Sequence, residues 1–182
     1  MDLLELNIDD RIVRVAPGTS VLAAASQAGV NIPTLCHLAE LSPSGACRMC
    51  VVQIDGMKSL AAACSLPVSA GMIVHTHTPA VLEARRMVLE LLLANHPADC
   101  FSCSRNLNCE LQELAAELGV KKVRFDGERR HYPLDDSNPF IVRNNEKCIL
   151  CGRCVRACQE LQVCNVLDFT GRGFDTKLAP AF

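Results

Sequence analysis

The chain opens with an alternation of hydrophobic and polar residues. Hydrophobic side chains alternate with polar ones over residues 4–8 and again over residues 11–15, on either side of Asp9-Asp10. A period of two is typical of β-strands and the acidic pair of a turn, so a β-hairpin is predicted here. Thr19 is expected to cap a helix over residues 20–28. A hairpin followed by a helix is how a β-grasp domain begins.

The rest of the pattern mixes further strands and helices. Over residues 79–95 hydrophobic side chains recur at helical spacing, and the last two turns of this helix are expected to be buried on most sides. Residues 121–136 are polar and are expected to form a connecting loop. The other predicted elements are strands over residues 50–54, 72–76, 140–143 and 166–169, and a helix over residues 109–118. The predicted fold class is α+β.

Composition limits where this protein works and what it binds. The N-terminus lacks the basic and apolar regions of a signal peptide, and the longest apolar run, residues 87–94, is far shorter than the roughly 20 residues of a membrane span. We therefore expect a cytoplasmic, reducing location, in which the twelve cysteines bind metal rather than each other. The net charge of −2 gives no reason to expect nucleic acid or an anionic membrane as a partner.

Four cysteines in the first part of the chain form one candidate metal site. Their spacing is C-x10-C-x2-C-x13-C, and four thiolates can hold a 2Fe-2S cluster. The small residues around Gly45 fit a loop whose backbone N–H groups point at sulfur, and Arg48 either does the same or faces solvent. A zinc knuckle is the alternative, although the unequal gaps favour a cluster loop with one distant ligand. The predicted ligands are Cys36, Cys47, Cys50 and Cys64.

The stretch NHPADCFSCSRNLNCELQEL provides a second candidate site. It brings one imidazole and three thiols within fourteen residues, a set that a disulfide framework would not use. Zinc is again the alternative, but the neighbouring cysteine groups have iron–sulfur spacing. We therefore predict a 4Fe-4S cluster with one histidine ligand. The predicted ligands are His96, Cys100, Cys103 and Cys109.

The run NEKCILCGRCVRACQEL is the most specific motif. Its C-x2-C-x2-C-x3-C spacing is that of bacterial ferredoxins, in which the fourth cysteine binds a different 4Fe-4S cluster from the first three. Only Cys164 remains downstream, so either Cys158 or Cys164 completes one cluster, or the site stays unfilled, or the natural chain continues past Phe182. Because the chain ends in a Gly-rich loop after a predicted strand, we expect a domain cut short. The predicted ligands are Cys148, Cys151, Cys154 and Cys158.

Taken in order, these motifs resemble an electron-transfer region that several families share. IPTLCH, GACRMC, AACSLP, NHPADCFSC and KCILCGRCVRAC stand where those families carry cluster ligands, and the resemblance covers essentially the whole chain. The families are the large iron–sulfur subunit of complex I, the diaphorase subunit of NAD-reducing hydrogenases, the N-terminus of multimeric iron-only hydrogenases, and NAD-dependent formate dehydrogenases. Complex I subunits lack a cysteine at the position of Cys158, which favours the hydrogenase and formate dehydrogenase side.

The resemblance implies three domains. These are a β-grasp 2Fe-2S ferredoxin domain over residues 1–78, a small helical His- and Cys-ligated 4Fe-4S domain over residues 79–138, and a truncated ferredoxin-like 4Fe-4S domain over residues 139–182. Besides the 2Fe-2S cluster and the His-ligated 4Fe-4S cluster, the chain would bind one or two further 4Fe-4S clusters if the C-terminal ligand sets are completed. The implied partners are a flavin- and NAD(P)H-binding subunit with its own clusters, and a hydrogenase or formate dehydrogenase catalytic subunit.

The predicted function is electron transfer between these partners, with no substrate site on this chain. His37, His75, His77 and His131 lack an acidic or nucleophilic partner nearby in the sequence, so none is predicted to act as an acid–base catalyst. Neither G-x-G-x-x-G nor a P-loop is present, so NAD, flavin and nucleoside triphosphates are expected to bind elsewhere. Two alternatives stay open: the front end of a longer catalytic chain, such as an iron-only hydrogenase or a formate dehydrogenase, and a zinc-stabilised interaction module.

Overall fold

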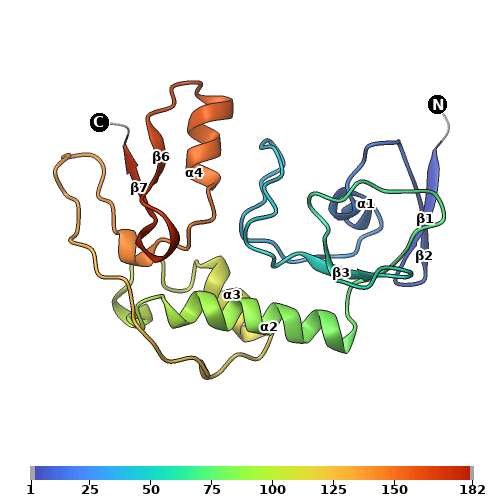
Figure 1. Ribbon diagram of the computed structural model, residues 1–182, viewed down its shortest axis with the longest axis horizontal. Coiled ribbons are helices and arrows are strands. Elements are labelled where there is room, and N and C mark those ends of the chain that lie inside the picture. Colours follow the sequence, from blue (N-terminus) through green and yellow to red (C-terminus); the bar gives the residue numbers. More distant parts are fainter. Residues whose placement is uncertain (1–2, 181–182) are drawn as a thin grey trace. The chain divides into compact units, whose positions relative to one another are not determined.

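The computed structural model describes residues 3–180, and they have the predicted mixture of α and β structure. The chain forms two compact units: the first comprises Met1–His37 and Pro43–Val88, and the second Leu38–Ser42 and Leu89–Phe182. The division falls within helix α2 (Pro79–Ala94), drawn in green in Figure 1. In the described part of the chain, no helix is both long enough and apolar enough to cross a membrane.

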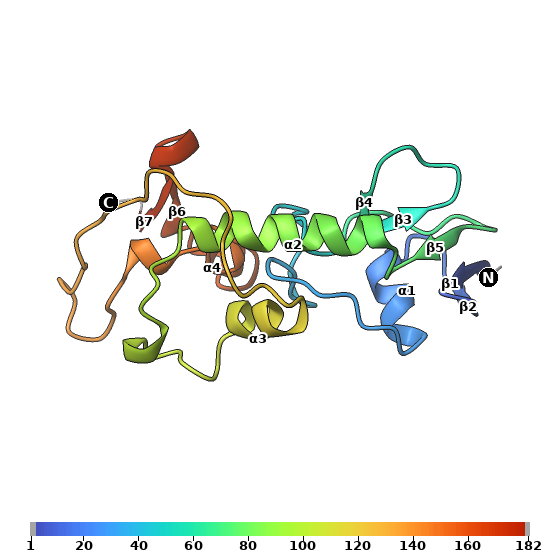
Figure 2. The same cartoon turned by 90° about the horizontal axis from the view of Figure 1, so that it is seen from below.

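The first unit is built on a five-stranded sheet. Its strand order is β2-β1-β5-β3-β4, as Figure 2 shows, with β1 and β5 parallel and the other neighbouring pairs antiparallel. The strands predicted over residues 4–15, 50–54 and 72–76 are all present, the last two slightly shortened. The strands are β1 (Leu4–Ile8), β2 (Arg11–Val15), β3 (Val51–Ile54), β4 (Ala61–Ala62) and β5 (Ile73–His75).

Local backbone conformation explains the hairpin and the first helix. Asp9 and Asp10 have positive φ angles of 45° and 64°, which suit a two-residue hairpin turn because aspartate tolerates this region. Helix α1 (Val21–Gln27) is capped by Ser20, whose hydroxyl accepts a hydrogen bond from a first-turn N–H at 3.2 Å. The predicted cap, Thr19, is wrong by one residue, because its hydroxyl donates to a carbonyl three residues earlier instead.

The core of the first unit lies between α1 and the sheet. Val52 and Val74 from neighbouring strands and Val21 from the helix are fully buried, and Figure 1 shows α1 beside the β1–β2 hairpin. Removing such side chains from water is the main stabilising contribution to a fold of this kind. Cys50 and Cys64 belong to the same buried cluster, so the first candidate metal site borders the core.

The second unit has short helices and little sheet. Its strands β6 and β7 form an antiparallel hairpin that lies beside α4 (Figure 1). The predicted loop over residues 121–136 contains no helix or strand. The elements after α2 are α3 (Glu110–Glu117), α4 (Arg153–Arg156) with a following π turn (Ala157–Leu161), β6 (Leu167–Thr170), β7 (Lys177–Pro180), and 3-10 turns at Cys100–Ser102, Asn145–Lys147 and Gly173–Asp175.

Two local predictions for the second unit are wrong. Residues 140–143 form no strand: only Arg143 pairs, through one bridge to Asp135, and the hydrophobic side chains before it are exposed. A hydrophobic run without alternation is an ambiguous strand signal, which explains the error. The described chain also does not end in a Gly-rich loop, because β7 pairs with β6 along its whole length. Ala181 and Phe182, on which the expected truncation also rested, lie outside the described residues.

Helix α2 is buried less evenly than its leucines predict. Leu89 is fully buried, but Leu91 is 54% exposed. Two charged side chains are buried instead: Arg85 donates to a β3 carbonyl at 2.9 Å, and Glu90 accepts from Arg124 at 2.7 Å. These partners offset the cost of removing charge from water. Because the partners are distant in sequence, the helical period alone does not reveal this burial.

Candidate metal centres

The structure brings together the four cysteines predicted for the 2Fe-2S site. The thiols of Cys36 and Cys47 hydrogen-bond to each other, as do those of Cys50 and Cys64, while Cys47 and Cys50 interact electrostatically. Three of the four are buried and Cys47 is half-buried. Two hydrogen bonds and one electrostatic interaction therefore link the four thiols, which come from separate segments of the chain.

Burial and hydrogen bonding have opposite effects on the pKa values of these thiols. Burial, aided by the neighbouring thiols, raises the pKa of Cys50 to about 12. Burial also acts on Cys36, but its pKa lies below the ordinary value because the Ser44 hydroxyl and the N–H groups of Cys47 and Ala46 donate to its sulfur. The predicted loop of N–H groups aimed at sulfur is thus confirmed at Cys36. Since metal binding deprotonates thiols, buried thiols with N–H donors fit an iron–sulfur cluster.

Two residues of this loop have left-handed backbone conformation. Gly45 has a φ of 62°, and a Cβ there would meet the hydroxyl of Ser65 at 3.4 Å, which explains the use of glycine. Arg48 has a φ of 58°, and its side chain is exposed. Of the two roles left open for Arg48, the structure therefore shows the solvent-facing one.

The four residues predicted for the histidine-containing site line one cavity of about 110 Å³ in the second unit. One water needs roughly 10–15 Å³ by this kind of measure, so the cavity has room for a group of several atoms. Among residues 3–180, no group of three or more His, Cys, Asp or Glu side chains has the spacing of a single-ion site. The cavity is lined by Leu93, His96, Asp99, Cys100, Cys103, Arg105, Asn106, Cys109, Leu111, Gln112 and Ala115.

His96 follows α2 directly, and its N–H continues the helical bonding to Leu93 at 3.1 Å. Burial lowers the pKa of the His96 ring, while the nearby Asp99 carboxylate acts in the opposite direction. A lowered pKa favours the neutral imidazole, which is the form that binds metal. Cys109 is the N-cap residue of α3, so both ends of the candidate ligand set are held by helices.

The three cysteines of the ferredoxin run before Cys158 lie close enough to interact electrostatically. Burial raises the pKa of Cys148 and of Cys154, and the charge of Cys151 adds to both shifts. The Leu150 N–H donates to the Cys148 sulfur at 3.4 Å. Gly152 has a φ of 71° and is the N-cap residue of α4, as expected for a glycine that permits the tight loop.

Cys158 lies in a different environment from these three. Its sulfur is 3.3 Å from that of Cys164, and it accepts from the N–H groups of Val166 and Leu167 at 3.2 and 3.4 Å. Within the described residues, the contacts found for its sulfur are thus to Cys164 and the backbone, and no disulfide joins any of the twelve cysteines. Helix α4 begins five residues before Cys158.

Two cations beside the candidate ligands were not found from the sequence. Lys147 Nζ lies 2.6 Å from Asp99 Oδ2 and also hydrogen-bonds to the Cys103 thiol, and Asp99 in turn raises the pKa of Lys147. Arg130 acts electrostatically on Cys148. No local pattern signals these pairs, because each joins segments far apart in the chain.

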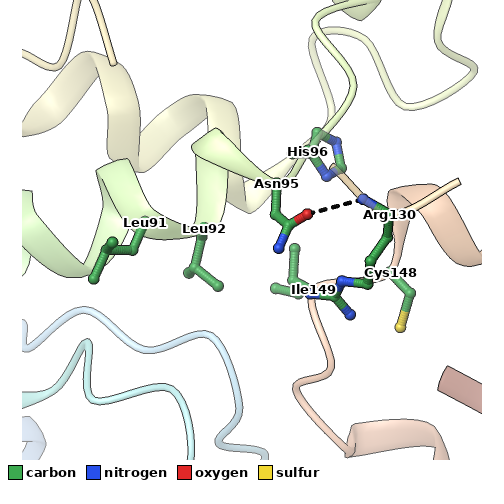
Figure 3. A pocket seen from close by; sticks show the side chains of 7 residues that line it. All are labelled: Leu91, Leu92, Asn95, His96, Arg130, Cys148 and Ile149. Carbon is green, nitrogen blue, oxygen red and sulfur yellow. Dashed lines mark hydrogen bonds between the residues drawn. The ribbon is translucent and has the colours of Figure 1, made fainter. Parts of the chain in front are cut away.

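Arg130 also belongs to a second, smaller cavity of about 50 Å³ in the same unit. Its backbone N–H donates to the Asn95 side chain at 3.2 Å (Figure 3). His96 lines this cavity as well as the larger one, so its ring borders both the histidine-containing site and the loop of Cys148. The lining residues are Leu91, Leu92, Asn95, His96, Arg130, Cys148 and Ile149.

Three other histidines have acidic partners that the sequence did not reveal. His75 lies 3.0 Å from Asp55, His77 lies 3.7 Å from Asp9, and His131 lies 3.2 Å from Glu146. Their side chains are 38%, 60% and 83% exposed. Exposed pairs of this kind contribute little to stability, and none of them lines either cavity.

Comparison with protein families assigns an iron–sulfur domain to each part of the chain. Residues 2–79 match the 2Fe-2S iron–sulfur cluster binding domain. Residues 85–124 match the NADH-ubiquinone oxidoreductase-G iron–sulfur binding region, and residues 138–181 match the ferredoxin-like domain of NADH-quinone oxidoreductase subunit 3. These matches confirm that the cofactors are of the 2Fe-2S and 4Fe-4S kinds.

Individual relatives cover nearly the whole chain. It is 42% identical to NADP-reducing hydrogenase subunit HndD of Solidesulfovibrio fructosivorans, over 100% of this chain and 32% of that protein. It is 37% identical to NADH-quinone oxidoreductase subunit 3 of Thermus thermophilus, over 96% of this chain and 27% of that protein. The chain thus spans about a third or less of these relatives.

A solved structure is similar over a larger share of its length. It is a chain of an NAD+-reducing NiFe hydrogenase in the H2-reduced state, with a TM-score of 0.92 and 34% sequence identity. The match covers 98% of this chain and 75% of that one.

Proposed function

The chain belongs to the iron–sulfur subunit family of NAD(P)-linked hydrogenases and complex I, and we propose from this premise that it relays single electrons. Its proposed position is between a flavin- and NAD(P)H-oxidising partner and a hydrogen-activating partner. A relay needs closely spaced sites of suitable potential rather than an acid–base catalyst, and the acid-paired histidines His75, His77 and His131 do not line the cavity of the histidine-containing site.

The observation that carries this proposal is the 110 Å³ cavity that His96 shares with three cysteines. Three thiols and one imidazole around a space of this size suit a four-iron cluster, and the matched family region carries a cluster of this kind. The proposed 2Fe-2S ligands are Cys36, Cys47, Cys50 and Cys64, and the proposed ligands of the His-ligated 4Fe-4S cluster are His96, Cys100, Cys103 and Cys109. The proposed ligands of further 4Fe-4S clusters are Cys148, Cys151, Cys154 and, for a separate cluster, Cys158.

When bound, such clusters supply reversible one-electron chemistry over a range of potentials set by charge, hydrogen bonding and exposure. The protein contributes those surroundings. In the first unit, Ser44 and two N–H groups donate to the Cys36 sulfur, and these bonds strengthen when the site gains an electron. Burial of Cys50 and Cys64 acts in the other direction, because a low-dielectric site disfavours added negative charge.

The finer architecture belongs to the same proposal. We assign residues 1–78 to a β-grasp 2Fe-2S domain, residues 79–138 to the His- and Cys-ligated domain, and residues 139–182 to a ferredoxin-like domain. The mixed sheet with α1 against it supports the first assignment. The cavity that His96 shares with Cys100, Cys103 and Cys109 supports the second, and the interacting cysteines of the ferredoxin run support the third.

A second candidate is the relay part of a longer catalytic polypeptide. The chain spans only 32% of the NADP-reducing hydrogenase subunit that it resembles, which is the observation favouring this candidate. A formate dehydrogenase partner remains a prediction of the sequence. Isolation of the native complex, followed by peptide mapping of the polypeptide that carries this sequence, separates a small relay subunit from a larger catalytic chain.

The proposal is tested by reconstituting the chain anaerobically with iron and sulfide and recording EPR spectra during stepwise reduction. We expect one 2Fe-2S signal and at least one 4Fe-4S signal. Cys36→Ser is expected to remove only the first, and Cys100→Ala only a signal of the second kind. A protein that binds zinc in these sites and takes up no iron or sulfide would refute the electron-relay function.

A further inference from the structure

We propose that Lys147 is a positioning residue that holds a positive charge against the histidine-containing site and raises its reduction potential, and that Asp99 limits this effect. The inference rests on the proposed function, because it concerns the potential of a cluster at His96 and its three cysteines. Lys147 is not itself a candidate ligand, and it lies next to Cys148 in the segment that carries the candidate ligands of a different cluster.

The contacts of Lys147 place its charge at this site. Its ammonium lies 2.6 Å from Asp99 Oδ2 and hydrogen-bonds to the thiol of Cys103. The side chain is only 26% exposed, so solvent screens its charge less than at an open surface. Lys147 immediately precedes Cys148, and a charge carried by the ferredoxin run therefore acts on a ligand of the preceding site.

The backbone on both sides of this contact is held in place. Lys147 ends the 3-10 turn Asn145–Lys147, which Asn144 caps by accepting the N–H of Glu146 at 3.0 Å. Glu146 in turn accepts from the backbone N–H of Tyr132 at 3.1 Å. Asp99 lies on the short loop between His96 and Cys100 and lines the cavity itself. The ion pair thus joins two segments whose positions are set independently.

The sign of the effect follows from simple electrostatics. Reduction adds negative charge to the cluster and its thiolates, and a nearby cation stabilises that charge, which raises the potential. Asp99 has the opposite charge and also acts on the His96 ring, so it lowers the potential. Arg130 is a second cation near this boundary, but its charge acts on Cys148. Arg105 also lines the cavity, but Lys147 hydrogen-bonds to a candidate ligand, the Cys103 thiol, which places its charge directly at the histidine-containing site.

Two single variants with opposite expected shifts test the proposal. In the reconstituted full chain, Lys147→Gln is expected to lower the midpoint potential of the histidine-containing cluster. The ratio of reduced to oxidised cluster at a fixed potential should fall about tenfold, which is 59 mV for one electron. Asp99→Asn is expected to raise the potential, and the double variant to lie between the two single ones. Lys147→Arg keeps the charge and is expected to retain most of the wild-type potential.

Lys121→Gln is the matched control, because Lys121 is an exposed lysine of the same unit outside both cavities. EPR-monitored redox titration is the measurement, with the 2Fe-2S signal of the same samples as an internal reference. Unchanged potentials in Lys147→Gln and Asp99→Asn, with intact clusters, would overturn the inference while leaving the relay function standing. Absence of a histidine-containing cluster in the wild-type chain would instead overturn the proposed function.

Discussion

The hydrogen bond from Ser44 to the Cys36 sulfur provides a direct test of how this protein sets the potential of its two-iron site. Replacing Ser44 with alanine removes the hydroxyl donor but leaves the N–H donors of Ala46 and Cys47 in place. A hydrogen bond to a charged group contributes about 1.5–3 kcal/mol. Because the bond exists in both oxidation states, only its strengthening on reduction shifts the potential. If that strengthening is about a third, it amounts to roughly 0.5–1 kcal/mol, or about 20–45 mV for one electron.

We therefore expect Ser44→Ala to lower the midpoint potential of the 2Fe-2S cluster by tens of millivolts and to leave the 4Fe-4S potentials unchanged. The assay is an EPR-monitored titration of the reconstituted chain. Ser44→Thr keeps the hydroxyl and should restore the potential, and Ser69→Ala removes an exposed hydroxyl in the same unit as a control. A wild-type potential in Ser44→Ala would show that this bond does not strengthen on reduction, contrary to the argument.

Three further predictions concern other parts of the chain. The His96 ring must be neutral to bind metal, so acid should remove its cluster before the all-cysteine 2Fe-2S cluster. Because burial lowers the pKa of this ring, the loss should begin only below the unperturbed value of about 6.5. Absorbance and EPR recorded as the pH falls through that value would show the reverse order if this is wrong. The sulfurs of Cys158 and Cys164 are 3.3 Å apart, so mild oxidation of the cluster-free chain with diamide should form a disulfide between them. Peptide mass spectrometry that finds both thiols alkylated after this treatment would contradict the prediction. Ile8→Ala leaves a cavity at a fully buried position and should lower the free energy of unfolding by about 2–5 kcal/mol. Ile12 on the same hairpin is 70% exposed, so Ile12→Ala should change this free energy by less than about 0.5 kcal/mol. Equal losses for the two variants in denaturant titrations would refute the assigned burial.

Local sequence features determined much of the first unit. The alternation over residues 4–15 and the Asp9-Asp10 turn predict the hairpin that the structure contains, because strand periodicity and turn preference act over only a few residues. The same reasoning failed at residues 140–143, where a hydrophobic run has no neighbouring strand to pair with beyond one bridge. It also misplaced one helix cap by a residue, because Thr19 and Ser20 are both suitable capping side chains.

Cysteine spacing likewise determined the candidate sites. Ligands two or three residues apart can surround one cluster only within a short loop, so the spacing itself indicates the chemistry. The cavity around His96 and the contacts among Cys36, Cys47, Cys50 and Cys64 agree with that prediction. The spacing predicts that Cys158 stands apart from the other three cysteines of its run, but its contact with Cys164 did not follow from spacing, because it depends on the turn after α4.

The surroundings of the sites were decided by tertiary structure alone. Lys147 meets Asp99 across 48 residues of sequence, and Arg130 reaches Cys148 from a loop without regular structure. The sequence does not show which distant charges will lie next to each other, since that depends on how the intervening chain packs. The sequence by itself therefore determined which atoms are available to hold metal, through short-range geometry. Only the fold decided which charges and donors surround those atoms, because these contacts form when distant segments pack together.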